Sequence, residues 1–387
     1  GSMPSDSRTV FEEGLIVPPV RLVREGLLAE DVLELILANV RTPAIRRGDL
    51  RAQLAANHLA QVRLAELAAR RGTPPIETGF AAVLAYAERR TREALRALPD
   101  GVAEAEGELE GDGVTDADVP IRVRVEIDGD ALRVDFTGTA PAVAGNVNCP
   151  LAVTRSACCF ALRVLTGADV PANAGAYAPL EVIAPENSLV CARAPSAVVA
   201  GNVETSQRIA DTVLLALSRL VDGLPAQGQG TMNNLVIGGA GWTYYETIGG
   251  GQGAGPRGPG DSGVHVGMTN TLNTPIEALE LEFPMRVERY ELARGSGGAG
   301  RHAGGDGIER AVRVLEPCSL SLLTDRRRHA PAGVRGGGDG AVGVNRLDGE
   351  AVAPKVAREL RAGQVVSLTT PGGGGWGRSG GDPGEAT

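Results

Sequence analysis

The spacing of apolar residues divides the chain into an early part with helical periodicity and a later part with strand periodicity. Apolar residues recur at helical spacing within residues 31–40, 47–71 and 76–98. Gly72-Thr-Pro-Pro separates the second segment from the third, and Pro99-Asp-Gly follows the third. This pattern predicts three helices, which we expect to form a helical hairpin with one extra helix.

The period changes to two after residue 100. Ile121-Arg-Val-Arg-Val-Glu-Ile alternates strictly, Asp128-Gly129 supplies a turn, and Leu132-Arg-Val-Asp-Phe alternates again. Strict alternation means that one face of each strand is buried and the other is solvated. The segment therefore predicts a β-hairpin.

Short apolar segments then alternate with loops rich in Gly, Asn and Pro. Val312–Leu315 and Leu320–Leu323 are expected strands, and residues 151–165 and 204–220 have the pattern of inserted helices. Glycine is concentrated in the last third without a fixed repeat, which favours loops that approach other backbone closely on a β-rich scaffold. These runs begin at Gly249, Gly295, Gly336 and Pro371.

The expected fold class is therefore α+β: a helical hairpin subdomain, then a β-rich mixed domain with inserted helices and Gly-rich loops. We place an extended segment at 1–28 that continues a missing N-terminal part. The helical subdomain spans 29–100, the β-rich domain spans 101–377, and a disordered tail spans 378–387.

Composition removes several classes of function. The net charge is −9 and the pI is about 5.2, so a basic surface for nucleic acid is not expected. The longest apolar stretches, such as Ile209–Leu217, are too short to span a bilayer, and no secretory signal opens the chain. Five cysteines without a Cys-x-x-Cys pair indicate buried, reduced thiols in a cytoplasmic protein.

The first of three polar segments, Gly201-Asn-Val-Glu-Thr-Ser-Gln-Arg, directly precedes a predicted helix. Thr205 or Ser206 would cap that helix, and capping alone explains their presence. The side chains that would also surround a helix N-terminus, whose free N–H groups suit anions, are Asn202, Glu204, Gln207 and Arg208. Both interpretations stay open.

The second segment is Gln229-Gly-Thr-Met-Asn-Asn, in which adjacent amides after a glycine are typical of a turn. The third runs from Asp261 to Glu277. If it is a strand, His265 and Thr271 share one face. A single histidine is more often a core residue than a catalyst, but His265 precedes two Asn, three Thr and a carboxylate. General acid and base roles are then available to His265 and Glu277.

Several segments resemble blocks of the hydantoinase B/oxoprolinase family, which also includes acetone and acetophenone carboxylase subunits. They occur in the family order from about residue 10 to residue 377, and together they are specific. The matching blocks are Ala38-Asn-Val-Arg-Thr-Pro with Arg47-Gly-Asp-Leu-Arg-Ala-Gln, Asp135-Phe-Thr-Gly-Thr, Gly145-Asn-Val-Asn-Cys-Pro, Gly201 to Arg208, Gln229 to Asn234, Tyr244-Tyr-Glu-Thr-Ile-Gly-Gly-Gly, His265 to Glu277 and Pro371-Gly-Gly-Gly-Gly-Trp-Gly.

The resemblance implies a two-component reaction. In this family a hydantoinase A-type ATPase subunit with an actin-like fold phosphorylates a carbonyl or amide oxygen of the substrate. The B component then completes hydrolysis of the cyclic amide or, in carboxylase relatives, joins bicarbonate-derived carbon. Phosphorylation turns a resonance-stabilised lactam into an imidate with a good leaving group, so the barrier to attack by water falls.

The chain departs from the family pattern at its start. Family B components carry an N-terminal His-x-x-Asp motif and a following His-containing block that supply metal ligands. None of the four histidines here is followed by Asp at the third position. We therefore expect a fragment, one half of a split protein or a degenerate member, with no metal site and no cofactor of its own. ATP would belong to the partner subunit, and the divalent metal to the missing segment.

The leading hypothesis is the B component of an ATP-dependent hydrolase of cyclic amides, inactive as this chain alone. The alternatives are a non-catalytic scaffold that binds the ATPase, or a subunit of a ketone carboxylase. The substrate stays open between hydantoin, 5-oxoproline and other lactams. We expect His265, Asn270 and Glu277 to line one cleft with Asn202 or Arg208. The candidate site residues are His265, Glu277 and Glu204 for catalysis and Asn202, Arg208, Asn234, Asn270 and Thr271 for substrate binding.

Overall fold

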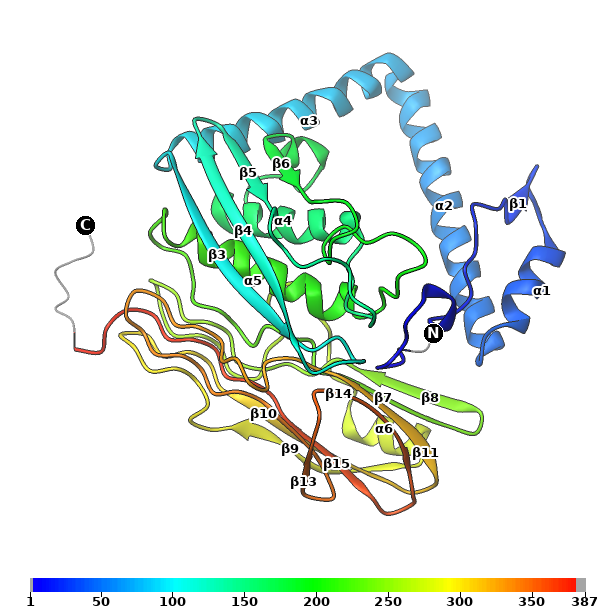
Figure 1. Ribbon diagram of the computed structural model, residues 1–387. Helices are drawn as coiled ribbons and strands as arrows, with labels where there is room; N and C mark the ends of the chain where they lie inside the picture. Colours follow the sequence, from blue (N-terminus) through cyan, green and yellow to red (C-terminus); the bar gives the residue numbers. More distant parts are fainter. Residues whose placement is uncertain (1–2, 381–387) are drawn as a thin grey trace.

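The computed structural model describes residues 3–380, which form a helical arm, an α/β layer and a β-sandwich (Figure 1). The arm contains α1 (Glu30–Ala38), α2 (Pro43–Arg71) and α3 (Thr73–Arg96). These helices confirm the three predicted from the apolar spacing. In the described part of the chain, no helix is both long enough and apolar enough to cross a membrane.

Within the arm, α2 and α3 do not form a hairpin. Only Gly72, with φ +80°, separates α2 from α3, and an antiparallel helix pair needs a loop of about two to five residues. The two helices therefore meet at a corner and diverge from it (Figure 1). α2 has no buried residue over its whole length, while α3 buries Ala87, Thr91 and Leu95 near its C-terminal end.

The α/β layer is a four-stranded sheet covered by two helices. Its strand order is β3-β4-β5-β6, antiparallel except for the parallel pair β5–β6. β4 and β5 form the predicted hairpin, and residues alternate between buried and more exposed along β4 as its sequence requires. The elements are β3 (Gly101–Glu110), β4 (Asp118–Asp128), β5 (Ala131–Asp135), β6 (Leu180–Ile183), α4 (Leu151–Thr166) and α5 (Ser206–Leu217).

The β-sandwich is made of two further sheets that share a second hydrophobic core. That core joins Leu235 and Leu320 of one sheet to Val312 and Val366 of the other. The predicted β-rich domain thus contains two cores. The four-stranded sheet is β14 (Lys355–Leu360), β11 (Cys318–Leu323), β7 (Asn234–Gly239) and β8 (Trp242–Glu246); the five-stranded sheet is β13 (Glu350–Val352), β12 (Val344–Leu347), β15 (Val365–Thr369), β10 (Gly307–Val314) and β9 (Met285–Ala293), with α6 (Ile276–Glu282) before β9.

The glycine-rich segments pack backbone against backbone, as the composition predicted. Gly373 lies at the centre: its carbonyl accepts from the N–H of Gly298 at 2.8 Å, and its own N–H donates to Gly305 at 2.9 Å. A Cβ on Gly251 would lie 2.0 Å from the Gly305 oxygen, so the approach excludes any side chain there. We call residues 249–255, 295–305, 333–343 and 371–377 the glycine bundle.

The N-terminal segment is anchored at its start and exposed further on. The Glu13 carboxylate accepts the N–H groups of Val198 and Val199 at 2.9–3.0 Å, and Ser321 Oγ donates to the Met3 carbonyl at 2.7 Å. Beyond it, Leu15, Ile16, Val17 and Val20 are exposed around the short strands β1 (Val23–Arg24) and β2 (Leu27–Leu28). Of the predicted disordered tail, 381–387 lie outside the described residues.

The cysteines were predicted from the sequence to be buried thiols. All five are free, and four of them are buried. Cys159 on α4 is half-buried.

Candidate functional site

The sequence block Gly145-Asn-Val-Asn-Cys-Pro packs directly against the block that begins at Gly201. Ala200 N–H donates to the Asn146 carbonyl at 3.0 Å, and a Cβ on Gly201 would lie 2.0 Å from the Asn148 oxygen. The Asn148 amide is buried and donates to the carbonyls of Val143, Gly145 and Ala197. The glycines and asparagines of these blocks therefore hold two loops together around the start of α5.

The expected helix cap at this position is wrong. Residues Gly201–Thr205 form a π-helical turn that runs without a break into α5. Thr205 Oγ donates to the Val147 carbonyl and Ser206 Oγ to that of Asn202, so neither side chain caps the helix. Because the helix continues through this turn, α5 does not present the free N-terminal N–H groups that an anion site needs.

The π-helical turn carries Glu204 into the interior. Its side chain is fully buried; Oε1 accepts from Asn234 Nδ2 at 2.8 Å and from the Met232 N–H at 3.1 Å, while Oε2 has no partner. Burial, and then the charge of Asp325, raises the pKa of Glu204 to about 8. Asn234 Oδ1 accepts from the Tyr245 hydroxyl at 2.8 Å. Two predicted site residues thus meet, in a network that already uses both ends of the Asn234 amide.

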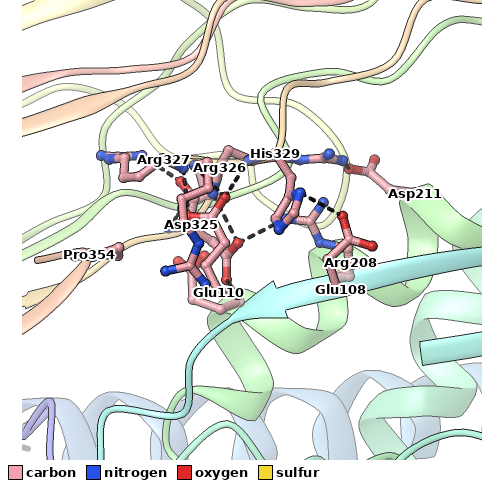
Figure 2. Close-up of polar contacts among 12 residues, drawn as sticks. Glu108, Glu110, Arg208, Asp211, Asp325, Arg326, Arg327, His329 and Pro354 are labelled. Carbon is pink, nitrogen blue, oxygen red and sulfur yellow. Dashed lines mark hydrogen bonds and ion pairs between the residues drawn. The ribbon is translucent and has the colours of Figure 1, made fainter. Parts of the chain in front are cut away.

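Asp325 is the centre of a second buried network (Figure 2). One carboxylate oxygen accepts from Arg208 at 2.9 Å, and the other accepts from Lys355 Nζ at 3.3 Å. Burial alone would raise the pKa of Asp325, but the charges of Lys355 and Arg208 hold this pKa down at about 2. Arg208 and Lys355 are almost completely buried as well.

Around Asp325, Glu110 at the end of β3 joins the two layers. Its carboxylate accepts three consecutive backbone N–H groups, those of Arg327, Arg328 and His329, each at 2.7 Å (Figure 2). The Arg327 guanidinium bonds to Asn233 and Asn345 at 2.7–3.1 Å, and burial lowers its pKa to about 10. These contacts connect the α/β layer to the β-sandwich.

The residues predicted from the sequence do not include Glu110, Asp325 or Lys355. Two signals were available: Lys355 is the sole lysine of the chain, and Asp325 opens the charged run Asp-Arg-Arg-Arg-His. A charge run in a sequence is usually a solvated surface, and only long-range packing shows that part of this one is buried.

The segment from Asp261 to Glu277 does not have the strand geometry in which His265 and Thr271 would share one face. It is a loop, tied to the glycine bundle by an isolated bridge between Gly250 and Val264. His265 Nδ1 lies 3.3 Å from Thr269 Oγ, and its Nε2 is buried without a partner; burial lowers the pKa of this imidazole. Thr271 is exposed, and Glu277 is exposed in the first turn of α6.

This loop contacts the Gly201 to Arg208 segment through Gln207, and not through Asn202 or Arg208. Gln207 accepts the Met268 N–H at 3.0 Å and donates to the Val266 carbonyl at 3.3 Å. Arg208 instead pairs with Asp325, and Asn202 is exposed. The roles predicted for the individual site residues stay predictions.

Gln207 borders a cavity between α4, α5 and the glycine bundle, which we call the α4–α5 cavity. Its volume is about 180 Å³. Phe160 and Gly267 line both this cavity and a more open groove that contains Asn270. The other residues lining the α4–α5 cavity are Val164, Asp211, Leu214, Leu215, Pro225, Ala226, Gln227, Gly228, Gly230, Gln252, Gly253, Val266 and Val334.

The described residues do not fit the divalent metal that the family resemblance implies. Between residues 3 and 380, no group of three or more His, Cys, Asp or Glu side chains converges on a point that suits a metal ion. His329 is flanked by two carboxylates, but its Nδ1 faces Glu108 at 3.2 Å and its Nε2 faces Asp118 at 2.9 Å. These carboxylates bind opposite nitrogens of the ring and do not share a centre.

Replacing Glu204 should change how stability depends on pH. Its pKa lies near 8 in the folded protein against 4.5 in the unfolded chain, so the folded state holds the extra proton. The resulting stabilisation is complete below pH 4.5 and is lost as the pH rises towards 8, at up to about 1.4 kcal/mol per pH unit. We expect Glu204→Gln to gain stability relative to the wild type between pH 5 and pH 8, measured by urea unfolding; parallel curves for the two proteins would contradict the buried, protonated carboxyl.

The layers define an α+β protein, and two of its sequence blocks, Gly201 to Arg208 and Gln229 to Asn234, meet at Glu204 and Asn234. The match to the hydantoinase B/oxoprolinase family model extends over residues 1–379, and the chain belongs to this family. It is 40% identical to an uncharacterised protein of Methanocaldococcus jannaschii over 97% of this chain and 67% of that protein. It is 37% identical to 5-oxoprolinase 1 of Arabidopsis thaliana over 97% of this chain and 32% of that protein.

The fold is shared with a solved enzyme structure. The ATP-dependent caprolactamase of Pseudomonas jessenii superposes with a TM-score of 0.87 and 28% identity, over 96% of this chain and 68% of that chain. The chain thus spans about two thirds of the archaeal protein and of the caprolactamase chain, and about one third of the plant 5-oxoprolinase.

Proposed function

We propose that this chain forms part of the B component of an ATP-dependent hydrolase of cyclic amides. The observation that carries the proposal is the agreement with the caprolactamase chain over 96% of this chain, an enzyme named for its action on a lactam. In the proposed reaction a hydantoinase A-type ATPase subunit phosphorylates the amide oxygen. Water then attacks the activated carbon in the B component and the ring C–N bond breaks; a second water releases the phosphate, so the products are the ring-opened amino acid, ADP and phosphate.

The buried junction suits a positioning role in this reaction. Glu204 and Asp325 are fully buried among internal partners, so they fix the loops that carry the sequence blocks. The metal that the family implies would be held outside the described residues. We therefore expect this chain alone neither to hydrolyse ATP nor to open a lactam; it also lacks the Gly-x-x-x-x-Gly-Lys-Ser/Thr loop that binds nucleotide phosphates in many ATPases.

A reconstitution experiment tests the proposal. The chain would be combined with a family A component and with the N-terminal segment of a B-type relative, and ring opening and phosphate release would be followed over a panel of lactams, hydantoin, 5-oxoproline and a ketone with bicarbonate. We expect ATP-dependent opening of at least one cyclic amide only when all parts are present. Carboxylation of the ketone without any ring opening would exclude the hydrolase assignment.

The arm supports a second role, that of a scaffold for the partner subunit. α2 is 29 residues long and buries none of them, and Leu59, Val62 and Phe80 are 55%, 39% and 56% exposed. Helical stability in proteins comes mainly from packing of an apolar face, and exposed apolar patches usually mark contacts with a partner. We propose that the A component or the remaining part of the B component covers this arm and the apolar residues of the N-terminal segment.

The exposed arm gives a testable result for the chain by itself. We expect the purified chain to bind a hydrophobic dye and to self-associate in size-exclusion chromatography with light scattering. The variant Leu59→Gln/Phe80→Gln should reduce both effects without loss of helix content in circular dichroism. A monomer that does not bind the dye would contradict the scaffold role and the expectation of an uncovered apolar face.

A further inference from the structure

Residues 265–274 form a loop whose ends are fixed and whose middle is exposed. Just before it, Val264 makes two backbone hydrogen bonds of 2.9 Å to the glycine bundle, and just after it, Pro275 is the residue from which α6 starts. Within the loop, Thr269 is 9% exposed, whereas Leu272 is 93% exposed. The loop therefore has a covered part and a free part, and we call residues 265–274 the strap.

A single side chain supplies the hydrogen bonds that support the strap backbone. Within the described part of the chain, no N–H or C=O group of residues 265–274 takes part in a backbone–backbone hydrogen bond. Instead, Gln207 Oε1 accepts the Met268 N–H at 3.0 Å, and Gln207 Nε2 donates to the Val266 carbonyl at 3.3 Å. Exposed segments with so few hydrogen bonds belong to the least stable parts of a fold, so the strap is the part that opens most easily here.

Gln207 suits this task because its amide is covered and its position is fixed. It is 1% exposed in the first turn of α5, and its neighbour Arg208 is held by Asp325 at 2.9 Å. On the side of the strap, Gly267 has a φ of +66°, and a Cβ there would lie 2.3 Å from Gln207 Oε1. Only a glycine lets the amide approach the strap this closely, so both partners of the contact depend on their residue type.

The strap forms part of the wall of the groove beside the α4–α5 cavity, which we call the α4 groove. Residues 267–270 line this groove together with Cys159 and Arg163 of α4 and with Tyr177. The volume of the groove is about 500 Å³. Because α4 belongs to the packed α/β layer and the strap does not, a displacement of the strap changes the width of the α4 groove.

We propose that the strap is a gate of the α4 groove and that Gln207 is its latch. In the closed state both Gln207 hydrogen bonds are formed and Thr269 is covered. In the open state both bonds are broken while the two ends of the strap stay fixed, as in lids that move about a few hinge residues. Gln207 is then a positioning residue for Asn270, which the strap carries. This gate is independent of the reaction proposed above.

Hydrogen exchange of the purified chain, resolved to single residues, tests the latch. We expect the Met268 N–H to be protected, and the Leu272 N–H to exchange close to its intrinsic rate. Gln207→Ala removes the acceptor and should raise the exchange rate at Met268 at least about fivefold, the effect of one net hydrogen bond on the opening equilibrium. Gly267→Ala displaces the same amide from the side of the strap, so it should raise the exchange rate at Met268 as well.

Gln252→Ala is the matched control, because Gln252 also accepts a backbone N–H close to the strap, that of Asp261 at 3.1 Å. It should leave the exchange rate at Met268 unchanged. A Met268 N–H that exchanges as fast as that of Leu272 in the wild type would overturn the proposal, and so would unchanged protection of Met268 in both latch variants. If Gln207→Ala does not fold, Gly267→Ala decides the result, because Gly267 is exposed and lies outside α5.

Labelling of an introduced thiol tests whether the strap opens as one body. Thr269→Cys, combined with Cys159→Ser, places a thiol on the covered side of the strap, and the four remaining cysteines are buried. Because the reagent reaches this thiol only in the open state, its labelling by iodoacetamide should accelerate in Gln207→Ala by about the same factor as the exchange at Met268. Labelling that does not respond to Gln207→Ala, although the exchange at Met268 does, would overturn the gate.

Discussion

Asp325→Asn is expected to destabilise the folded protein by about 3–5 kcal/mol, because it leaves buried cations without their counter-charge. Asp325 is fully buried, and its carboxylate bonds to Arg208 and Lys355, whose side chains are 2% and 3% exposed. An asparagine of the same size keeps the shape of the junction and removes only the charge. The loss is measurable as a lower urea midpoint at pH 7, followed by circular dichroism.

Two further variants separate the charge effect from a general sensitivity to substitution. Asp169→Asn changes the same residue type in the pair with Arg90, where Asp169 is 70% exposed, and should leave the urea midpoint close to that of the wild type. Lys355→Met, added to Asp325→Asn, removes one of the unpaired cations and should recover part of the lost stability. A double variant less stable than Asp325→Asn alone would argue against an electrostatic origin.

The elements of the fold were predictable because they depend on local pattern. The β4–β5 hairpin follows from strict alternation and the Asp128-Gly129 turn, and α2 and α3 follow from apolar spacing and the break at Gly72. Their arrangement was not predictable in the same way. A single connecting residue prevents a hairpin, and this depends on where the helices end, which is the least certain part of a prediction from sequence.

The candidate site was likewise predictable in its local segments and not in the contacts between them. Glu204 and Asn234 belong to separate blocks that were recognised individually, and the structure joins them at 2.8 Å. Asp325 is 117 positions from Arg208 and was missed, because nothing local to Asp325 indicates that its partner is buried. The strand geometry considered for the Asp261 to Glu277 segment does not occur, because the segment is a loop up to the start of α6. Contacts between distant segments decide both cases.

The glycine bundle provides the other large expected effect. Gly373→Ala should destabilise the protein by about 3 kcal/mol or more, the upper part of the range for overpacking. A Cβ at this position would lie 2.0 Å from the Gln252 oxygen and 2.3 Å from its carbonyl carbon. Those atoms are backbone, and Gln252 is itself held by the Gly305 N–H at 2.8 Å. The segments cannot separate by the required distance without breaking the hydrogen bonds that define the bundle.

Gly255→Ala is the matched control, because it lies in the same bundle and has nothing within 4 Å of its Cβ direction. Its φ is not in the left-handed region, so alanine is accepted there and stability should stay within about 0.5 kcal/mol of the wild type, or rise slightly as the unfolded chain loses freedom. Urea unfolding followed by tryptophan fluorescence compares the two variants directly; the signal comes from Trp376, three residues from Gly373, and from Trp242. Equal stability of Gly373→Ala and Gly255→Ala would mean that the segments of the glycine bundle are free to move apart. The glycines would then not be required for close packing of these segments.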